Sequence, residues 1–288
     1  MSEGFELLVD RQALSGQGPL WMPALNTLHW VDPLRRELHT YHRETGADEV
    51  RVLPGRITAL AATRSGQLVA AGDRGFVRVH PGRGAVEQVA AVHSGDRAND
   101  GSCDPAGRFV AGTITLDRRP ESSGVYVLDG TRARPLAGRF TACGGLAWSP
   151  DGATMYVVDS PARTVWTYDY DVRRGRASSP QRWLVCSEFE GQPEGLAVDS
   201  EGCAWVAMHG TGRIHRYAPG GDLETVLWAP TTRVTNLAFG GRRLDEMYVT
   251  SGCAGYDERA LAADPYAGAL FRFSPGATGL PAIPWNGT

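Results

Sequence analysis

The sequence predicts an all-β protein, a six-bladed β-propeller with four short antiparallel strands in each blade. The main observation is a phrase that recurs about six times, in which an apolar run is followed by an Asp/Pro/Gly turn and then a β-rich run. The copies begin at Gly18–Trp21, Leu60–Thr63, Gly101–Asp104, Gly145–Trp148, Gly195–Val198 and Leu237–Phe239. Four turn glycines (Gly66, Gly107, Gly152 and Gly202) recur at intervals of roughly 40 to 50 residues, the period of propeller blades.

The strands follow from local composition. Residues 27–32 are rich in β-branched and aromatic residues, and residues 37–42 alternate polar and apolar side chains. One strand recurs in successive units, each time before a turn; its copies are residues 67–72, 108–113, 154–159, 203–208 and 246–250. Strands of the type 164–169 and 213–217 come next, which gives about four short strands per unit and little helix.

The chain ends complete the predicted ring. We expect the N- and C-terminal segments to share one blade, because a closed arrangement leaves no exposed sheet edge. Residues 257–263 have the composition of one or two helical turns, and residues 173–180 read as a polar hairpin tip. With no linker or low-complexity stretch, residues 1–288 are predicted to form a single propeller domain.

Composition excludes several classes of function. Lys+Arg 29 against Asp+Glu 32 gives a formal net charge of −3, which offers no electrostatic attraction for nucleic acid or an anionic membrane. The five scattered cysteines lack a CxxC pair and indicate reduced thiols. No signal peptide or membrane-spanning run is evident, so we expect a cytoplasmic protein, monomeric or homodimeric, with a small-molecule substrate. High Arg and low Lys usage suggests a bacterial origin.

The repeat register also predicts the site. Counting back from each turn glycine leads to one residue at the start of each innermost strand. These residues are Gln17, Thr58, Asn99, Gly144, Glu194 and a position near Asn236. They should ring one mouth of the central channel, where buried polar groups bind a cation, a substrate or channel water.

These phrases resemble the senescence-marker-protein/gluconolactonase/regucalcin family, which includes luciferin-regenerating enzymes. The resemblance runs through nearly the whole chain. It is carried by Gly18–Trp21 with Trp30–Asp32, Arg97–Gly101 with Asp104–Arg108, Gly145–Gly152, Pro193–Gly195, Met247–Thr250 and Ala267–Leu270. Membership implies a six-bladed propeller that binds one divalent cation at the channel mouth and opens sugar lactones.

The resemblance also implies site residues. The family's usual metal ligands are a Glu, an Asn and an Asp, and this sequence has Gln17, Gly144 and Glu194 in those places. The family's substrate-contacting Arg and Asn are retained as Arg97 and Asn99. Asp117 stands where an acidic residue often follows the Ala-Gly-Thr segment. Asp100, Gln17, Asn236 and His209 are further predicted substrate contacts.

The replacements weaken the predicted metal site. Ca²⁺ wants about six or more oxygens and several charges, whereas Glu194 supplies one carboxylate and Gln17 and Asn99 supply amides. Zn²⁺ or Fe²⁺ wants His, Cys or several carboxylates; Cys143 and His209 are the candidates for a rebuilt site. We expect weak binding of Ca²⁺, Zn²⁺, Mn²⁺ or Fe²⁺, or none, and no organic cofactor.

Three hypotheses follow. In the first, a lactonase-like hydrolase uses a metal or Arg97 to polarise the lactone carbonyl, Glu194 or Asp117 as the base, and Asn99 to orient hydroxyl groups. In the second, Glu194 is the proton shuttle of a metal-independent cyclase, isomerase or condensing enzyme of a biosynthetic pathway, in a pocket shaped by aromatic side chains. The third is a non-catalytic binding propeller. The aromatic candidates are Trp21, Trp148 and Tyr256, although blade core is the alternative reading for the two tryptophans.

Overall fold

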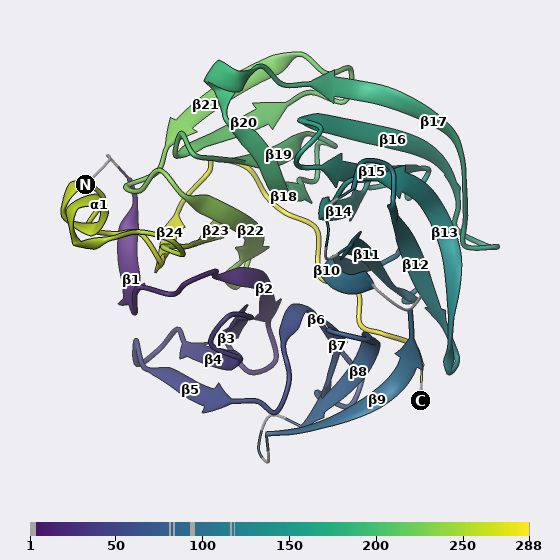
Figure 1. Cartoon of the computed structure of the whole chain (residues 1–288), viewed down its shortest axis with the longest axis horizontal. Coiled ribbons are helices and arrows are strands. Elements are labelled where there is room, and N and C mark those ends of the chain that lie inside the picture. The colour runs from purple at the N-terminus through teal and green to yellow at the C-terminus, as the bar shows by residue number, and fades with distance from the viewer. Residues whose placement is uncertain are drawn as a thin grey trace.

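Six four-stranded antiparallel sheets surround a common axis in the computed structural model, so the predicted six-bladed propeller is confirmed (Figure 1). The structure describes residues 4–80, 82, 84–92, 96–115, 117 and 119–287, and the side chain of residue 96 is not described. The predicted domain range of 1–288 therefore begins and ends in residues outside the described set.

The first three blades follow one another along the chain, each running outward from the axis. The first consists of β2 (Gln17–Met22), β3 (Thr27–Asp32), β4 (Glu37–His42) and β5 (Asp48–Val52). The second consists of β6 (Ile57–Ala62), β7 (Leu68–Gly72), β8 (Gly75–His80) and β9 (Ala85–Ala91). The third consists of β10 (Asp96–Cys103), β11 (Phe109–Thr115), β12 (Ser123–Asp129) and β13 (Arg132–Phe140).

The last three blades close the ring as predicted. The fourth consists of β14 (Cys143–Trp148), β15 (Thr154–Asp159), β16 (Thr164–Asp171) and β17 (Arg176–Val185). The fifth consists of β18 (Gln192–Val198), β19 (Ala204–His209), β20 (Arg213–Tyr217) and β21 (Leu223–Trp228), preceded by the short 3-10 helix η1 (Glu188–Glu190). In the sixth, β22 (Val234–Gly240), β23 (Glu246–Ser251) and β24 (Ala269–Phe273) pair with the N-terminal β1 (Glu6–Asp10).

The turn glycines have the backbone that the repeat predicts. Gly66, Gly107, Gly152 and Gly202 all have φ between 72° and 86°, the left-handed region that a residue with a Cβ rarely adopts. Each lies in the turn between the innermost and second strands of its blade. In the first blade, Asn26 takes the corresponding turn position with φ 52°. The recurring glycine therefore marks a turn, and its spacing gives the blade period.

The hydrophobic core lies mainly between the sheets. One cluster, for example, joins Phe76 of the second blade to Phe109 of the third, and Trp285 near the C-terminus completes it. The helix α1 (Glu258–Ala263) lies between β23 and β24, and the Asp257 side chain caps its N-terminus by accepting from the Ala260 amide. All five cysteines are free and buried. No helix among the described residues is long and apolar enough to span a membrane.

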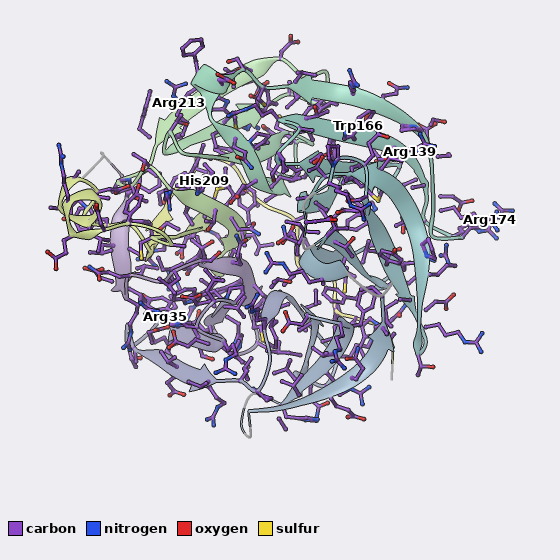
Figure 2. The ribbon with its side chains drawn as sticks, in the orientation of Figure 1. Arg35, Arg139, Trp166, Arg174, His209 and Arg213 are labelled. Atoms are coloured by element: carbon purple, nitrogen blue, oxygen red, sulfur yellow. The ribbon has the colours of Figure 1, made fainter. Side chains whose placement is uncertain are left out.

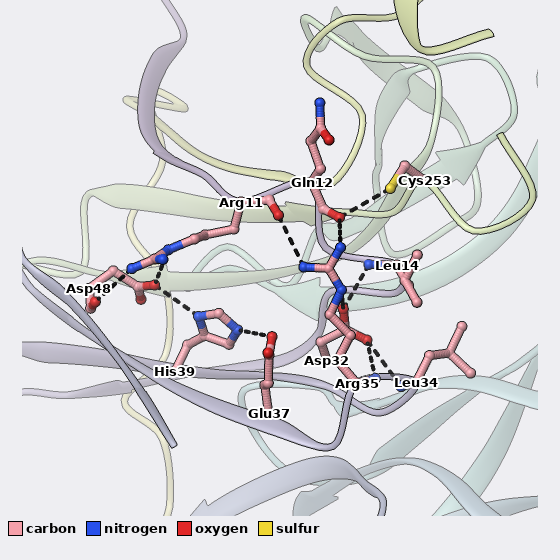
Figure 3. A network of polar contacts seen from close by, with 10 residues as sticks. All are labelled: Arg11, Gln12, Leu14, Asp32, Leu34, Arg35, Glu37, His39, Asp48 and Cys253. Atoms are coloured by element: carbon pink, nitrogen blue, oxygen red, sulfur yellow. Dashed lines mark hydrogen bonds and ion pairs between the residues drawn. The ribbon is translucent and has the colours of Figure 1, made fainter. Parts of the chain in front are cut away.

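A polar network joins the first and sixth blades where the chain passes from β1 to β2 (Figure 3). The buried Asp32 carboxylate accepts from the Leu14 amide at 2.7 Å and from the Leu34 amide at 3.0 Å. Arg35 donates to the Gln12 carbonyl, which also accepts from the Cys253 thiol of the sixth blade at 3.1 Å. These bonds hold the connecting segment between the two blades and so stabilise ring closure.

Candidate active site at the channel mouth

All six innermost strands change register near their first residues. In the six blades the shifts lie between Gln17 and Leu20, Ile57 and Ala59, Ala98 and Gly101, Cys143 and Gly145, Pro193 and Leu196, and Val234 and Asn236. Such a bulge bends the strand and redirects side chains, and bulges are common beside active sites. The six residues obtained by counting back from the turns lie at or within these shifts. We call this end of the channel the mouth.

Close approach of neighbouring innermost strands explains the glycines beside the bulges. A Cβ on Gly145 would lie 2.7 Å from the Glu194 carbonyl oxygen of the next blade. A Cβ on Gly195 would lie 2.5 Å from Asn236 Cα, one blade further on. Real Cβ atoms do not approach other atoms so closely, so these positions admit only glycine unless the strands separate. The glycine of the Gly-Leu-Ala phrase is thus required by the close contact between neighbouring blades, and its repetition marks the blade period.

Three adjacent blades supply one arc of the mouth. Asn99 on β10 donates from Nδ2 to the Cys143 carbonyl of β14 at 2.7 Å, which fixes the amide across the gap between blades. Glu194 on β18 is half-buried, with a buried Oε2, and its Cα lies 3.4 Å from the place of a Cβ on Gly144. Arg97, two residues before Asn99, is also half-buried. The strand starts of this arc therefore carry a carboxylate, an amide and an arginine.

Sequence reasoning missed one residue of this arc. Ser160, in the turn after β15, is buried, and its Oγ has no hydrogen-bond partner among the described residues. That oxygen lies 1.9 Å from the position a Cβ on Gly144 would take. The hydroxyl therefore occupies space left by the missing side chain of residue 144. No motif singles out Ser160, because its place at the mouth comes from the β15–β16 turn.

Asp100 and Asn236 form a hydrogen bond across the channel. The innermost strands contact one another in the ring order β2, β6, β10, β14, β18, β22, so β10 and β22 lie on opposite sides of the axis. Asn236 Nδ2 donates to Asp100 Oδ1 at 3.1 Å, while Asp100 Oδ2 accepts from the Leu146 amide at 3.1 Å. We call the Asp100–Asn236 pair the crossbar. Both side chains are buried and engaged with the protein, and their predicted role as substrate contacts stays a prediction.

Burial controls the charge of the crossbar. Desolvation raises the pKa of Asp100 to about 7, although hydrogen bonds from Gly101, Asn236 and Leu146 act to lower it. The carboxyl group is therefore partly protonated near neutral pH. It has a different electrostatic environment from the half-buried Glu194.

His209 and Asp117 lie at the mouth ends of second strands, beside the innermost strands that carry the arc. His209 ends β19, where it pairs with Gln192 of β18, and Figure 2 shows it toward the fifth and sixth blades. Burial, with the charge of Arg233, lowers its pKa to about 4, so it is neutral at pH 7. Asp117 lies beyond β11, with its side chain 55% exposed and ion-paired with Arg119 at 2.5 Å. Although desolvation acts to raise the pKa of Asp117, hydrogen bonds from Thr115 and Arg119 lower it overall.

The side chains at the mouth do not fit a tightly held divalent cation. Among the described residues at the three matched ligand positions, Glu194 supplies one carboxylate, Gln17 supplies an amide and Gly144 contributes no side chain. The Asn99 amide and the Ser160 hydroxyl lie beside them. A hard cation gains affinity from ligand charge, and a single negative charge provides little. Cys143 does not compensate: its pKa is raised well above the usual value, first by burial, and its Sγ packs against Gly112 in the core.

A different acidic group lies at the opposite end of β18. Asp199, Glu201 and Cys203 offer ligand atoms within 4.8 Å of one another. Arg216 already supplies positive charge there, with its NH2 2.8 Å from Asp199 Oδ2 and in contact with Glu201. Burial raises the pKa of the Cys203 thiol to about 11, which disfavours the thiolate that a metal requires. This group is therefore an ion-pair cluster around Arg216.

The aromatic candidates lie elsewhere in the propeller. Trp21 stacks on Tyr248 with ring centroids 5.5 Å apart, and Trp148 meets Tyr170 edge-on at 5.6 Å. Both tryptophans are buried between blades, as the core reading predicts, and both also line a cavity of ≈ 370 Å³ inside the ring. Tyr256 hydrogen-bonds to Thr232 at 3.1 Å and to Asp264 at 3.3 Å, in the connection before α1.

Comparison with known proteins places this geometry in a family. The SMP-30/Gluconolactonase/LRE-like region matches residues 15–253, and the chain belongs to that family. The pentonolactonase XacC of Haloferax volcanii is 36% identical over 279 residues, 95% of each chain. The sugar lactone lactonase YvrE of Bacillus subtilis, whose assignment is itself marked putative, is 30% identical over 287 residues, 98% of each chain.

Solved structures agree in fold. The calcium-binding protein regucalcin of Agrobacterium tumefaciens superimposes with a TM-score of 0.94 at 27% identity, covering 99% of this chain and 98% of its own. A luciferin-regenerating enzyme gives a TM-score of 0.89 at 26% identity, covering 98% of each chain. The resemblance to this family is thereby confirmed, and the lactonase relatives support a gluconolactonase-like hydrolase.

Proposed function

We propose that this protein opens a polyhydroxylated lactone by adding water at the channel mouth, with Glu194 as general base and without a resident metal ion. The observation that carries the proposal is the arc of Arg97, Asn99 and Glu194 at the bulged starts of the innermost strands. Support comes from the similarity to a pentonolactonase over nearly the full chain. The weak donor set for a cation is the reason for assigning the chemistry to side chains.

In the proposed reaction, a water molecule attacks the lactone carbonyl carbon and transfers a proton to the Glu194 carboxylate. The Arg97 guanidinium stabilises the negative charge that develops on the carbonyl oxygen. Cleavage of the ring C–O bond then returns the proton from Glu194 to the leaving oxygen. The products are a free hydroxyl group and a carboxylic acid, so one water is consumed for each ring opened.

The remaining groups position the substrate. The Asn99 amide is held by its bond to the Cys143 carbonyl, which leaves its Oδ1 as an acceptor for a substrate hydroxyl. The Ser160 hydroxyl can both donate and accept, and it occupies the space beside Gly144. Polar groups that already sit in place favour a substrate with several hydroxyls, because little ordering is needed on binding.

The altered ligand positions also favour a second function. Gln17 and Gly144 remove a charge and a side chain from the family's cation site, while Glu194 keeps a proton-transfer group. A metal-independent cyclase, isomerase or condensing enzyme would retain this carboxylate and need no cation. A non-catalytic binding propeller would need neither the cation nor proton transfer.

Lactone hydrolysis by chelator-treated protein distinguishes these functions. Pentono- and hexonolactones are incubated with the protein, and acid release is followed by titration at constant pH. We expect turnover that survives chelation and falls about 10²-fold or more in Glu194→Gln. Glu49→Gln, a substitution at a side chain 73% exposed on the outermost strand β5, is the matched control and should retain wild-type turnover.

Three other outcomes would contradict the proposal, and each would favour a different function. Turnover that disappears on chelation and returns with one added cation would establish a metal-assisted mechanism. Lactone binding without acid release would favour the binding propeller. Conversion of a substrate without consumption of water would favour the cyclase, isomerase or condensing enzyme.

A further inference from the structure

A groove between the fourth and fifth blades lies outside the proposed active site, and its volume is ≈ 560 Å³. Its wall includes the turns that follow the innermost strands β14 and β18, so the groove lies toward the end of the blades opposite the mouth. Residues of the outer strands β15, β16 and β17 complete the wall. Figure 1 shows β14–β17 and β18–β21 as neighbouring blades. We call this space the interblade groove.

Aromatic rings from both blades pack against one another beside this groove. The half-buried Trp183 ring meets Tyr156 of its own blade with centroids 5.0 Å apart and Tyr217 of the fifth blade at 6.0 Å. Its Nε1 donates to the Pro219 carbonyl of the fifth blade at 3.0 Å. The ring is therefore held in place with its one donor already used, and its exposed part offers apolar surface to the groove.

The Tyr156 hydroxyl is a polar group of the wall that the protein leaves without a partner. Tyr156 is only 3% exposed, and its hydroxyl forms no hydrogen bond with a residue that the structure describes. The oxygen is not one of the fully enclosed polar atoms that lack a partner, so it keeps surface toward the groove. Burial, followed by the charge of Asp151, raises the pKa of this hydroxyl, which stays protonated at neutral pH. A ligand N–H that reached the oxygen would add a hydrogen bond.

The interblade groove contains carboxylates without a matching base. Its wall includes Asp151, Asp169 and Glu201, and no Lys, Arg or His is among its described lining residues. Glu201 is already in an ion pair. Asp151 Oδ1 accepts from the Ser149 hydroxyl and the Ala153 amide, which lower the pKa of the carboxyl group and leave Oδ2 available. Asp169 is exposed and forms no hydrogen bond or ion pair through its side chain with any described residue.

We propose that the interblade groove binds a primary ammonium ion carried on a small apolar skeleton. The Asp151 and Asp169 carboxylates attract the charge and accept from its N–H groups. The Tyr156 hydroxyl accepts from a further N–H, while the skeleton lies against the Trp183 ring. A neutral polyol would leave both carboxylates without a cation.

A metal ion and a link to lactone opening are both set aside by the same wall. Among the described residues, neither Asp151 nor Asp169 belongs to a group of three ligand residues with atoms within 4.8 Å of one another, whereas a hard cation gathers many oxygens around itself. Glu194 and the other residues at the mouth do not line the groove. The inference therefore does not depend on the proposed hydrolase activity.

The test compares three probes of similar skeleton on the full chain: benzylammonium, benzyl alcohol and benzyltrimethylammonium. The alcohol lacks the charge, and the quaternary ion keeps the charge but has no N–H. Binding is measured by ligand-observed NMR and titration calorimetry at low ionic strength. The variants are Asp169→Asn and Tyr156→Phe, which removes only the hydroxyl. Asp129→Asn, at a carboxylate 72% exposed in the third blade, is the matched control.

We expect benzylammonium to bind wild type and the control about tenfold more tightly than benzyl alcohol. Asp169→Asn should weaken benzylammonium binding about threefold to fivefold. Tyr156→Phe should weaken it at least about twofold and leave benzyltrimethylammonium binding unchanged. No saturation by benzylammonium, or unchanged affinity in folded Asp169→Asn, would overturn the site. Equal affinity for the alcohol would overturn the assignment of a cation. Equal losses for the two cations in Tyr156→Phe would overturn the assignment of an N–H donor.

Discussion

The two ends of the central channel are built from the same six strands and yet differ in chemistry. At the mouth, bulged strand starts carry Arg97, Asn99 and Glu194, half-buried and in contact with a neighbouring turn through Ser160 and Gly144. Beyond the crossbar, regular pairing resumes, and leucines from five blades (Leu20, Leu60, Leu146, Leu196 and Leu237) line a cavity of ≈ 370 Å³. The difference teaches that a bulge of one or two residues changes what a repeated strand presents to the axis.

The Asp100–Asn236 crossbar is the boundary between these regions. Its hydrogen bond joins opposite blades, so it resists separation of β10 from β22 as well as dividing the channel. The Asp100 carboxyl is removed from water, and its hydrogen-bond donors Gly101, Asn236 and Leu146 carry no positive charge, so burial raises its pKa.

The largest effect is expected from Gly195→Ala. The new Cβ would lie 2.2 Å from Asn236 Oδ1 and 2.5 Å from Asn236 Cα, so rotation of one side chain cannot relieve the overlap. The innermost strands of the fifth and sixth blades must separate, and the crossbar must shift. We expect a loss of more than about 3 kcal/mol in the free energy of unfolding, measured by urea denaturation.

Gly138→Ala is the matched control for that prediction. Gly138 lies on β13, the outermost strand of its blade, and a Cβ there would meet nothing within 4 Å. Its stability should stay within about 0.5 kcal/mol of wild type. Similar unfolding curves for the two alanine variants would show that the innermost strands are less closely packed than the structure indicates.

Gly195 belongs to the repeated Gly-Leu-Ala phrase, and this repeat is the source of what the sequence predicts about the fold. The repeat of turn glycines and the Gly-Leu-Ala phrase predict six blades, ring closure by the chain ends, and the places of Gln17, Asn99 and Glu194 at the starts of innermost strands. These are local patterns repeated at a fixed period, so their register transfers from blade to blade. That the family's cation site is altered stays a prediction, which needs only the identities at matched positions.

Contacts between different blades were not predictable from the repeat. Ser160 reaches the mouth from a turn whose sequence carries no distinguishing motif, and its role depends on the absence of a side chain at Gly144. The crossbar joins residues 136 positions apart, and its hydrogen bond depends on how the ring closes. The segment that covers the cavity beyond the crossbar, residues 280–283, likewise comes after the last repeat. All three features depend on contacts between segments that lie far apart in the sequence or outside the repeat.

The crossbar should make stability depend on pH. Because the pKa of Asp100 is raised from 3.8 to about 7, the native state binds more protons than the unfolded state between these values. This group therefore contributes stability that is fully present at low pH and is lost as pH rises through 7. Asp100→Asn cannot ionise, so its stability relative to wild type should improve by at most about 2.7 kcal/mol between pH 5 and pH 7.

Urea denaturation of both proteins at pH 5, 6 and 7 measures this difference. A constant difference between wild type and Asp100→Asn across the series would mean that the carboxyl has its ordinary pKa and that the crossbar is more hydrated than its burial indicates. A difference in the free energy of unfolding that is the same at every pH is expected in addition, because in one orientation the asparagine NH₂ group faces the Leu146 N–H, and two donors cannot bond to each other. Only the change with pH reports the ionisation.

At the mouth, Gly144→Asn should be destabilising and Ser160→Gly should compensate. A Cβ at residue 144 would lie 1.9 Å from Ser160 Oγ, and the asparagine amide needs the same space. Because the hydroxyl can rotate away, we expect a cost of only about 1–2 kcal/mol for the single substitution. The double variant Gly144→Asn/Ser160→Gly should recover part of it in thermal unfolding. Additive effects would show that the two positions do not share this space.

The smallest effect is expected from Ser160→Ala, and it is the sharpest test of how the mouth holds its substrate. The substitution removes one hydroxyl that lacks a protein partner, so stability should change by less than about 1 kcal/mol. If the hydroxyl binds a substrate hydroxyl in ground and transition states alike, KM for the lactone rises about threefold to tenfold while kcat is unchanged. Ser160→Thr keeps the hydroxyl and should restore part of the lost affinity. A fall in kcat with unchanged KM would place Ser160 in the proton transfer with Glu194 instead, whereas unchanged values of both would show that its hydroxyl only fills the space beside Gly144.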